Sequence, residues 1–419
     1  MMTIRNPLLR RLGLFVWLAF TLNVPLMAFE APQLFRASQI LPPPLLAGPH
    51  HRVREHASAD GYLIHFTVDS DYGIYECAGV AELRRRIGEI QAISELVTVS
   101  RGDLFAEGLR KSVESPIAAV KNIAADPGNA IKQVPKSVGH FFGKVGSGIG
   151  NAARKAGEKK AGEPVTDPEQ VGRGVGRILK SAAGFDKAKL ECARQLGVDP
   201  YTDNSRLQEE MEKVTWAFFA GGLPLRIGAS LASGGVSQAI NATEFIGLPD
   251  TLYQLTPGEL DFQNRNVLKE MGIPPTNIDA LFANPAVIRS VRHQMVTALK
   301  ELNLVGRAEI IDQLAQCDSV WRAHFLHDAL QLLRWRHRTS PYRGLGMNGR
   351  LAVGMTADGA VEIPAPIDYV LWTPEVAEFA NREDIARFQR RLILQGTLSE
   401  ETARELAASG WQVVQVPRS

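Results

Sequence analysis

The sequence has little cysteine and lacks the short motifs that mark common catalytic sites. Its 419 residues include only three cysteines, Cys77, Cys192 and Cys317, and no Cys-x-x-Cys pair. A zinc ribbon or a thioredoxin-type site would need such a pair, so we expect three buried thiols that pack as small apolar side chains. The sequence also contains no Gly-x-Ser-x-Gly, His-Glu-x-x-His or P-loop pattern. These motifs carry nucleophilic, zinc-dependent and phosphate-binding chemistry, so no catalytic residue and no cofactor is predicted.

The apolar run near the N-terminus is too short to cross a bilayer comfortably. It covers the eleven residues Leu12–Leu22, whereas a spanning helix needs about 20. Three arginines precede the run, and Ala28 follows it as a small residue suited to cleavage. This order of regions predicts a signal peptide over residues 1–28, and therefore export to the periplasm or cell envelope. An uncleaved anchor over residues 12–28 and a buried N-terminal helix are the alternatives.

Positive charge is concentrated in one glycine-rich segment, residues 110–160. This segment holds ten cations and three acids, a net charge of +7, whereas the whole chain carries +2. Without the segment and the first 28 residues, the remaining body carries about −8. The segment is therefore suited to an anionic membrane or a protein partner, or to docking on the acidic body of its own chain. The residues predicted to make the membrane or partner contact are Lys121, Lys132, Lys136, Lys144, Arg154 and Lys155.

Composition and turn signals divide the chain into six stretches. These are a signal peptide (1–28), a proline-rich linker (29–60), a β-hairpin followed by a helix (61–109), a basic segment of short proline-started helices (110–166), a helical domain (167–340) and a small α/β module (341–419). The linker prediction rests on Pro42-Pro43-Pro44, because proline-rich chains favour extended conformations. The predicted fold is mainly α: a helical array with an N-terminal β-hairpin and a small C-terminal α/β module.

Periodicity and helix-start signals place the elements within these stretches. Two β-rich runs flank Asp69–Tyr72 and predict the hairpin, and apolar residues at helical spacing from Ala81 to about Phe105 predict the next helix. Capping residues before proline predict helix starts in the helical domain, at Asp199-Pro200, Thr256-Pro257 and Asn284-Pro285. The nearly uncharged stretch Trp216–Asn241 predicts a buried helical hairpin, with a membrane-inserted hairpin as the alternative.

The C-terminal module shows its own turn and strand signals. Asp358-Gly359 predicts a hairpin turn within residues 351–363, and residues 368–372 predict a third strand. Thr373 is expected to start a helix that continues to about Gly396. A further helix from Ser399 and a last strand from Trp411 complete the prediction.

His324 and His327 are the nearest approach to a metal site. They lie one helical turn apart, as two ligands of a shared metal would. A helical projection places them opposite the apolar arc that contains Trp321 and Phe325, so we expect both histidines to be solvated and no metal to be bound. Tryptophans and arginines alternate near residues 321–338, but export argues against a nucleic-acid partner.

Three phrases of the sequence suggest a relationship. Ser115-Pro-Ile-Ala-Ala-Val-Lys121, Asp126-Pro-Gly-Asn-Ala-Ile-Lys132 and Asp199-Pro-Tyr-Thr-Asp203 resemble an uncharacterised group of exported proteobacterial proteins. The resemblance covers most of the chain after residue 28 and implies export, but it carries no activity and no site residue. The proline-punctuated repeats also resemble connector segments of some bacterial toxins.

The function predicted from the sequence is that of an exported non-enzymatic protein of the bacterial envelope, binding a protein partner or a membrane surface. One alternative is an envelope enzyme whose site lies where the helical domain meets the α/β module, with His337, Asp368 and Glu375 as residues that would converge there. The other alternative is a membrane-active, toxin-like protein in which Trp216–Asn241 inserts into the bilayer.

Overall fold

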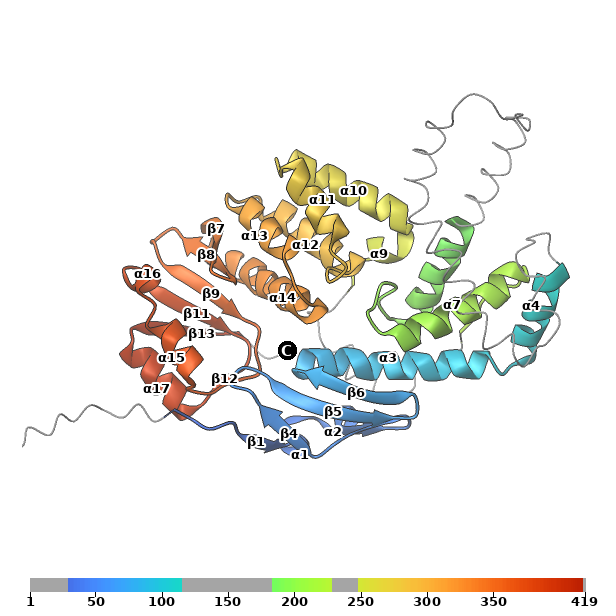
Figure 1. The fold of residues 1–419 in the computed structure, drawn as a ribbon, viewed down its shortest axis with the longest axis horizontal. Helices are drawn as coiled ribbons and strands as arrows, with labels where there is room; N and C mark the ends of the chain where they lie inside the picture. Colours follow the sequence, from blue (N-terminus) through green and yellow to red (C-terminus); the bar gives the residue numbers. More distant parts are fainter. Residues whose placement is uncertain (1–28, 115–182, 228–247, 417–419) are drawn as a thin grey trace, which may run out of the picture.

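The computed structural model describes residues 29–114, 183–227 and 248–416. Figure 1 shows an N-terminal sheet covered by the long helix α3 and a group of helices above α3. A C-terminal sheet lies beside the end at which α3 begins. The prediction of a mainly α fold is wrong, because the described residues form sheets of six, five and two strands. Several of these strands are only two to four residues long, so each contains too little alternation to be recognised in the sequence.

The N-terminal sheet is antiparallel throughout and has the strand order β1-β4-β5-β3-β2, with β6 on the other side of β5. Its elements are β1 (Leu34–Arg36), α1 (Ala37–Ile40), α2 (Pro43–Leu46), β2 (Ala47–Gly48), β3 (His51–Val53), β4 (His56–Ala59), β5 (Ile64–Ser70) and β6 (Gly73–Ala78). The β5–β6 hairpin confirms the predicted one. Helix α3 (Val80–Val99) follows and buries Leu83, Ile87 and Ile90 against the sheet.

The predicted proline-rich linker over residues 29–60 is wrong, because this stretch supplies strands β1 to β4 and two short helices. The prolines are compatible with structure: Pro42 is the N-cap of α2 and Pro43 its first residue, where a missing N–H costs nothing. Ala37 lies between Pro32 and Pro42, Leu45 lies between Pro44 and Pro49, and both are fully buried in the core under α3. The burial of apolar residues between the prolines therefore explains why residues 29–60 are part of the folded sheet, despite their proline content.

The helical part of the described chain follows the N-terminal sheet, and most of its buried apolar residues belong to two hydrophobic cores. It contains α4 (Asp103–Glu114), a helical stretch over residues 183–196, α7 (Ser205–Ala220), α9 (Thr251–Gln254), α10 (Pro257–Glu270), α11 (Pro275–Ala283), α12 (Arg289–Leu302), α13 (Arg307–Ala315) and α14 (Val320–His337). No helix in the described ranges is long and apolar enough to cross a membrane. Trp216 and Phe218 are buried in α7, whereas residues 228–241 of the predicted hairpin lie outside the described residues.

The three helix starts predicted from a cap before proline have different outcomes. Thr256 caps α10 with a full capping box to Glu259, as predicted. The starts at Asp199 and Asn284 are wrong, because each side chain instead accepts a hydrogen bond from the backbone N–H two residues later. This arrangement is an Asx turn, which competes with helix initiation at the same residue types.

The C-terminal sheet is mixed, with the order β13-β11-β9-β8-β7. Its strands are β7 (Tyr342–Asn348), β8 (Leu351–Thr356), β9 (Val361–Ala365), β11 (Arg390–Leu394) and β13 (Trp411–Gln415), and a separate parallel pair joins β10 (Tyr369–Val370) to β12 (Thr397–Leu398). Helix α14 covers one face, and α15 (Pro374–Ala380), α16 (Glu383–Ala386) and α17 (Glu400–Ala408) pack on the other.

The predicted hairpin around Asp358, the helix from Ser399 and the last strand from Trp411 are confirmed. The single helix from Thr373 to Gly396 is wrong, because α15 and α16 are followed by strand β11. Strand β7 was also missed.

Two acidic side chains connect the N-terminal part of the described chain to the segment around β10. Glu30 accepts a hydrogen bond from the Trp372 backbone N–H at 2.6 Å. The carboxylate of Asp368 accepts from the N–H of Ile64 at 3.1 Å and of Val80, the first residue of α3, at 3.2 Å. Asp368 thus joins the C-terminal part to both the N-terminal sheet and its covering helix.

Candidate functional site

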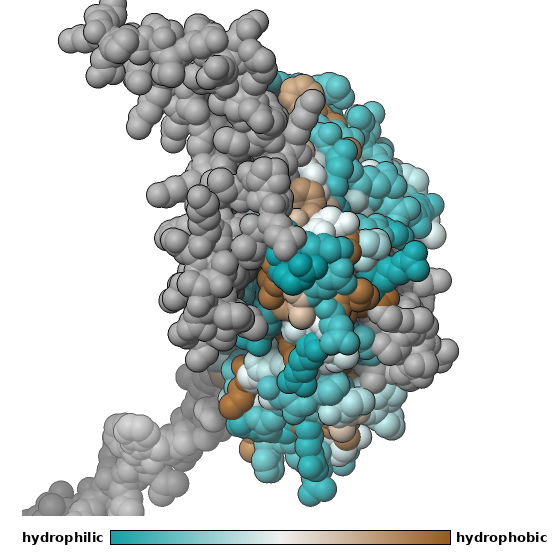
Figure 2. All heavy atoms as spheres, turned by 90° about the vertical axis from the view of Figure 1, so that its right-hand side faces the viewer, coloured by the Kyte–Doolittle hydropathy of each residue, from teal (hydrophilic) through white to brown (hydrophobic). Residues whose placement is uncertain are grey.

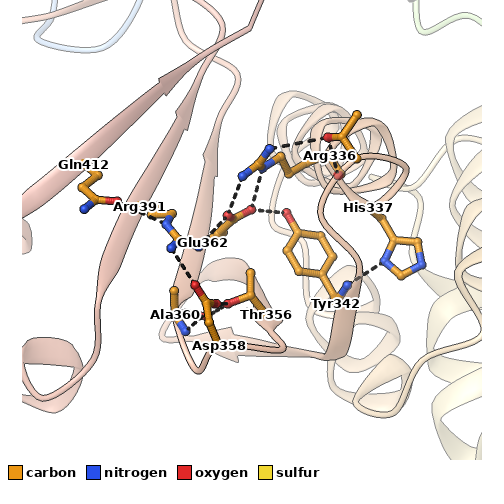
Figure 3. Close-up of polar contacts among 10 residues, drawn as sticks. Arg336, His337, Tyr342, Thr356, Asp358, Ala360, Glu362, Arg391 and Gln412 are labelled. Carbon is orange, nitrogen blue, oxygen red and sulfur yellow. Dashed lines mark hydrogen bonds and ion pairs between the residues drawn. The ribbon is translucent and has the colours of Figure 1, made fainter.

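A buried carboxylate lies where the helical domain meets the C-terminal sheet. Glu362 is on β9, the central strand of that sheet, and its side chain is 0% exposed. Figure 3 shows it surrounded by side chains from α14, β7 and β11. An ionised carboxylate is expensive to bury unless it is paired and hydrogen-bonded, so its partners decide what it can do.

Two arginines and one tyrosine occupy both oxygens of Glu362. Arg336, in the last turn of α14, makes a bidentate contact with the Glu362 carboxylate: Nε donates to Oε2 and Nη2 donates to Oε1, both at 3.2 Å. The Tyr342 hydroxyl donates to Oε2 at 2.7 Å, and Arg391 Nη1 donates to Oε1 at 3.4 Å. Each oxygen therefore has two donors, which fills the lone-pair positions of a carboxylate.

The sheet register explains why Arg391 reaches this position. Its Cα is paired with that of Glu362 on one side and with that of Gln412 on the other, so the three side chains form a row on the face covered by α14. Arg391 also binds Asp358 Oδ2 at 2.7 Å, and this bond, together with one from Thr356, holds the pKa of Asp358 below its usual range. Two carboxylates thus face two guanidinium groups, and their formal charges cancel.

Tyr342 reaches Glu362 only because residue 354 is glycine. A Cβ at Gly354 would lie 2.6 Å from the Tyr342 ring, closer than any non-bonded contact allows. Burial and the neighbouring Glu362 raise the pKa of Tyr342, so its hydroxyl stays protonated and serves as a hydrogen-bond donor. The group cannot act as a base at neutral pH.

A second buried carboxylate has the same character. Glu89 on α3 is 2% exposed and accepts hydrogen bonds from Thr202, from Arg86 at 2.8 Å and from Asn204 at 2.9 Å. Arg86 also binds Asp203 at 2.7 Å. The cluster fixes the turn before α7 onto α3.

The six predicted contact residues, Lys121, Lys132, Lys136, Lys144, Arg154 and Lys155, lie outside the described residues. Only the start of the basic segment is described, on α4. There Lys111 pairs with Glu107 at 2.8 Å, and both side chains are exposed.

The expectation that His324 and His327 are solvated is wrong. Helix α14 lies between α3 and the C-terminal sheet, so it has no single exposed face. His324 Nδ1 is 3.4 Å from Arg85 Nη1, and burial together with Arg85 holds its pKa well below the usual value. His327 is buried and binds Asp328 at 2.8 Å. Within the described ranges, no three His, Cys, Asp or Glu side chains are placed to hold a metal ion.

The three residues that were expected to converge at the junction do not. Asp368 caps α3, and Glu375 is exposed in the first turn of α15. His337 accepts a hydrogen bond from the Tyr342 N–H at 2.9 Å and is the only one of them near Glu362 (Figure 3). Sequence reasoning missed Glu362 itself, although it is the only charge in the apolar run Ala360–Ile367.

The prediction of buried thiols is confirmed, since all three cysteines are buried and unbridged. Burial raises the pKa of Cys77 to about 12 and that of Cys192 to about 12, so neither is a reactive thiolate at neutral pH.

Comparison with protein-family models, with curated proteins and with solved structures finds no match to this chain.

Proposed function

We propose that this protein is an exported, non-enzymatic protein of the bacterial envelope that binds an anionic surface, either of the membrane or of a partner protein, through its basic segment. The single observation that carries the non-enzymatic part is the saturation of Glu362, whose oxygens each have two donors. A general base needs a free lone pair within reach of substrate. The junction residues therefore act as a structural clamp.

The binding part of the proposal is supported by charge. The segment of residues 110–160 carries +7 on a chain of +2, and a cation near an anionic lipid surface contributes on the order of 1 kcal/mol, less at high salt. Helix α4 leads into this segment, on the side of the molecule seen in Figure 2. Hydrophilic side chains dominate the described part of this side, with small apolar patches between them.

Co-sedimentation with vesicles tests the membrane form. We expect the protein to bind vesicles that contain phosphatidylglycerol at low salt, to release them at high salt, and to ignore neutral vesicles. The test variant replaces the six predicted contact residues by Gln. A matched control replaces six exposed cations of the described body by Gln: Arg36, Arg101, Lys187, Lys269, Lys300 and Arg387. The control should bind as the wild type does, whereas the test variant should not.

Photo-crosslinking in cells distinguishes the partners. With a photoreactive residue at Lys132, adducts to lipid support a membrane surface and adducts to another protein support a partner. Adducts only within the chain would show that the segment docks on its own acidic body, and the binding proposal would be withdrawn. Recovery of the protein in the cytoplasmic fraction would remove the envelope part.

A further inference from the structure

Strand β13 forms one edge of the C-terminal sheet. It pairs in parallel with β11, and no described strand pairs with its outer side. Gln412 and Gln415 are exposed, and the Val413 side chain is 40% exposed. Among the described strands, none therefore uses the backbone groups on that outer side.

The hydrogen bonds to β11 show which residues face outward. The Val416 N–H donates to the Leu394 carbonyl at 2.8 Å. Because alternate residues of a strand direct their N–H and C=O groups to the same side, Gln412 and Val414 also face β11. The N–H and C=O groups of Trp411, Val413 and Gln415 then face outward.

The other edge strands of the two large sheets in the described chain are covered, charged or very short, whereas β13 is neither charged nor very short. The outer side of β7 receives the Val305 carbonyl, which accepts from the Leu345 N–H at 2.9 Å. Strand β6 carries Glu76, and β1 and β2 have three and two residues. Native sheets block their edges by charge, shortness or cover. Strand β13 has five residues, no charge and no proline.

We propose that β13 pairs antiparallel with β13 of a second copy of this chain, across a two-fold axis at Val413. The five-stranded sheet then continues into a ten-stranded one. A two-fold axis perpendicular to the sheet keeps each face on the same side, so the central residue must pair with itself. Val413 is both the middle of Trp411–Gln415 and an outward-facing residue. In this register Val413 pairs with Val413 of the second copy, and Trp411 pairs with Gln415 of the second copy, so every outward N–H and C=O group is used.

Three features favour a second copy over an unrelated peptide. Self-pairing brings no like charges together, because the strand has none. The exposed Val413 side chains of the two copies would lie next to each other. They are on the face of the sheet that α15 and α17 cover, because Leu392, which is paired with Val413 in the sheet, packs there. Finally, the symmetric register leaves no outward N–H or C=O group of the strand unpaired.

The test is the molar mass of the purified chain by light scattering, over a concentration series. Val413→Lys places two cations opposite each other and should raise the dimer dissociation constant by at least about tenfold. Val413→Pro removes only an outward N–H, which the monomer does not use, so it should abolish the dimer and keep the fold. Met355→Lys is the control, because Met355 is also 40% exposed on the same sheet but lies on the inner strand β8.

A dimer that persists in Met355→Lys and is lost in both Val413 variants supports the proposal. It is overturned if the wild type is monomeric throughout, or if the dimer is insensitive to Val413, or if the control dissociates equally. Should the Val413 variants unfold, Val413→Cys decides. A disulfide-linked dimer is expected on non-reducing gels for this variant and not for Met355→Cys, and failure of Val413→Cys to crosslink overturns the proposal.

Discussion

The two large sheets differ in how deeply their charged side chains are buried. The N-terminal sheet is antiparallel, and the alternate residues of β5 that face away from α3 remain partly exposed. There Arg54 and Asp69 form a pair at 2.8 Å with side chains 52% and 48% exposed. The C-terminal sheet has helices on both faces, every residue of β9 is buried, and its one charge, Glu362, has four donor contacts.

This difference indicates that the contribution of an arginine–carboxylate pair to the free energy of unfolding depends on how deeply the pair is buried. An exposed pair contributes about 0–1 kcal/mol, because water replaces the lost partner. A buried pair adds little net stability over an apolar core, but removing one partner leaves an uncompensated charge and is costly. The four predictions below run from the largest expected effect to the smallest. The first three test this contrast around Glu362, and the fourth concerns Asp368, which joins the C-terminal part to the N-terminal sheet through backbone hydrogen bonds.

Glu362→Ala should have the largest effect. It leaves Arg336 and Arg391, whose side chains are 21% and 17% exposed, without their shared carboxylate. We therefore expect a loss of about 3 kcal/mol in the free energy of unfolding, the lower end of the range for breaking a buried pair, measured by urea denaturation. The matched control is Asp69→Ala, which should cost less than about 1 kcal/mol. Equal effects of the two substitutions would contradict the contrast between the sheets.

Tyr342→Phe should have the next largest effect. It removes only the hydroxyl that donates to Glu362 at 2.7 Å, and hydrogen bonds to charged groups contribute about 1.5–3 kcal/mol. The ring and its contact with Gly354 remain. In the background of Glu362→Ala the same change should cost much less, and a double-mutant cycle that shows simple additivity would rule out the coupling.

Gly354→Ala should destabilise by about 1–3 kcal/mol, because the new methyl group displaces the Tyr342 ring. Gly258→Ala is the control, since Gly258 lies in the first turn of α10 with nothing within 4 Å of an added Cβ. That substitution should be neutral or slightly stabilising. Thermal unfolding of the two variants gives the comparison, and a neutral Gly354→Ala would show that the ring position is not constrained.

Asp368→Asn should have the smallest effect at fixed pH, because the amide oxygen can still accept from the Ile64 and Val80 N–H groups. Its signature is pH dependence. Burial raises the pKa of Asp368, so the folded state holds this proton more tightly than the unfolded state does. The contribution of Asp368 to stability therefore falls as pH rises from its unfolded pKa of about 4 through its folded value.

Urea unfolding of wild type and Asp368→Asn over this pH range measures that contribution. The difference should shift in favour of the variant as pH rises and then become constant. A pH-independent difference would show that Asp368 has an ordinary pKa in the folded protein.

The part of the fold that could be predicted is the part with strong local signals. The hairpin β5–β6, helix α3, the capping box of α10, helix α17 and strand β13 all follow from turn residues, caps and periodicity within a few residues. Strands β1 to β4 and β11 could not be predicted, because their short runs become strands only through pairing within their sheets. There β1 pairs with β4, β2 with β3, β3 and β4 with β5, and β11 with β9. The expectation of a mainly α fold failed for this reason.

The candidate site could be anticipated only in position. The alternative of an enzyme placed ionisable groups at the junction of the helical domain and the C-terminal module. Ionisable groups do lie there, but His337 alone of the three named residues is near Glu362. The sequence can show that Glu362 is a lone charge in an apolar run. It cannot show that Arg336, 26 positions earlier, reaches its carboxylate.

The sequence by itself determined the local features of this protein: the apolar character of its three cysteines, the arginines before the apolar run of residues 12–22, the excess of basic residues over 110–160 and the elements with clear caps. The tertiary structure alone decided which surfaces are buried. The helical projection of α14 is the clearest example, because it placed His324 and His327 in solvent. Helix α3 packs against that side of α14, and a residue's exposure depends on neighbours that are distant in the chain.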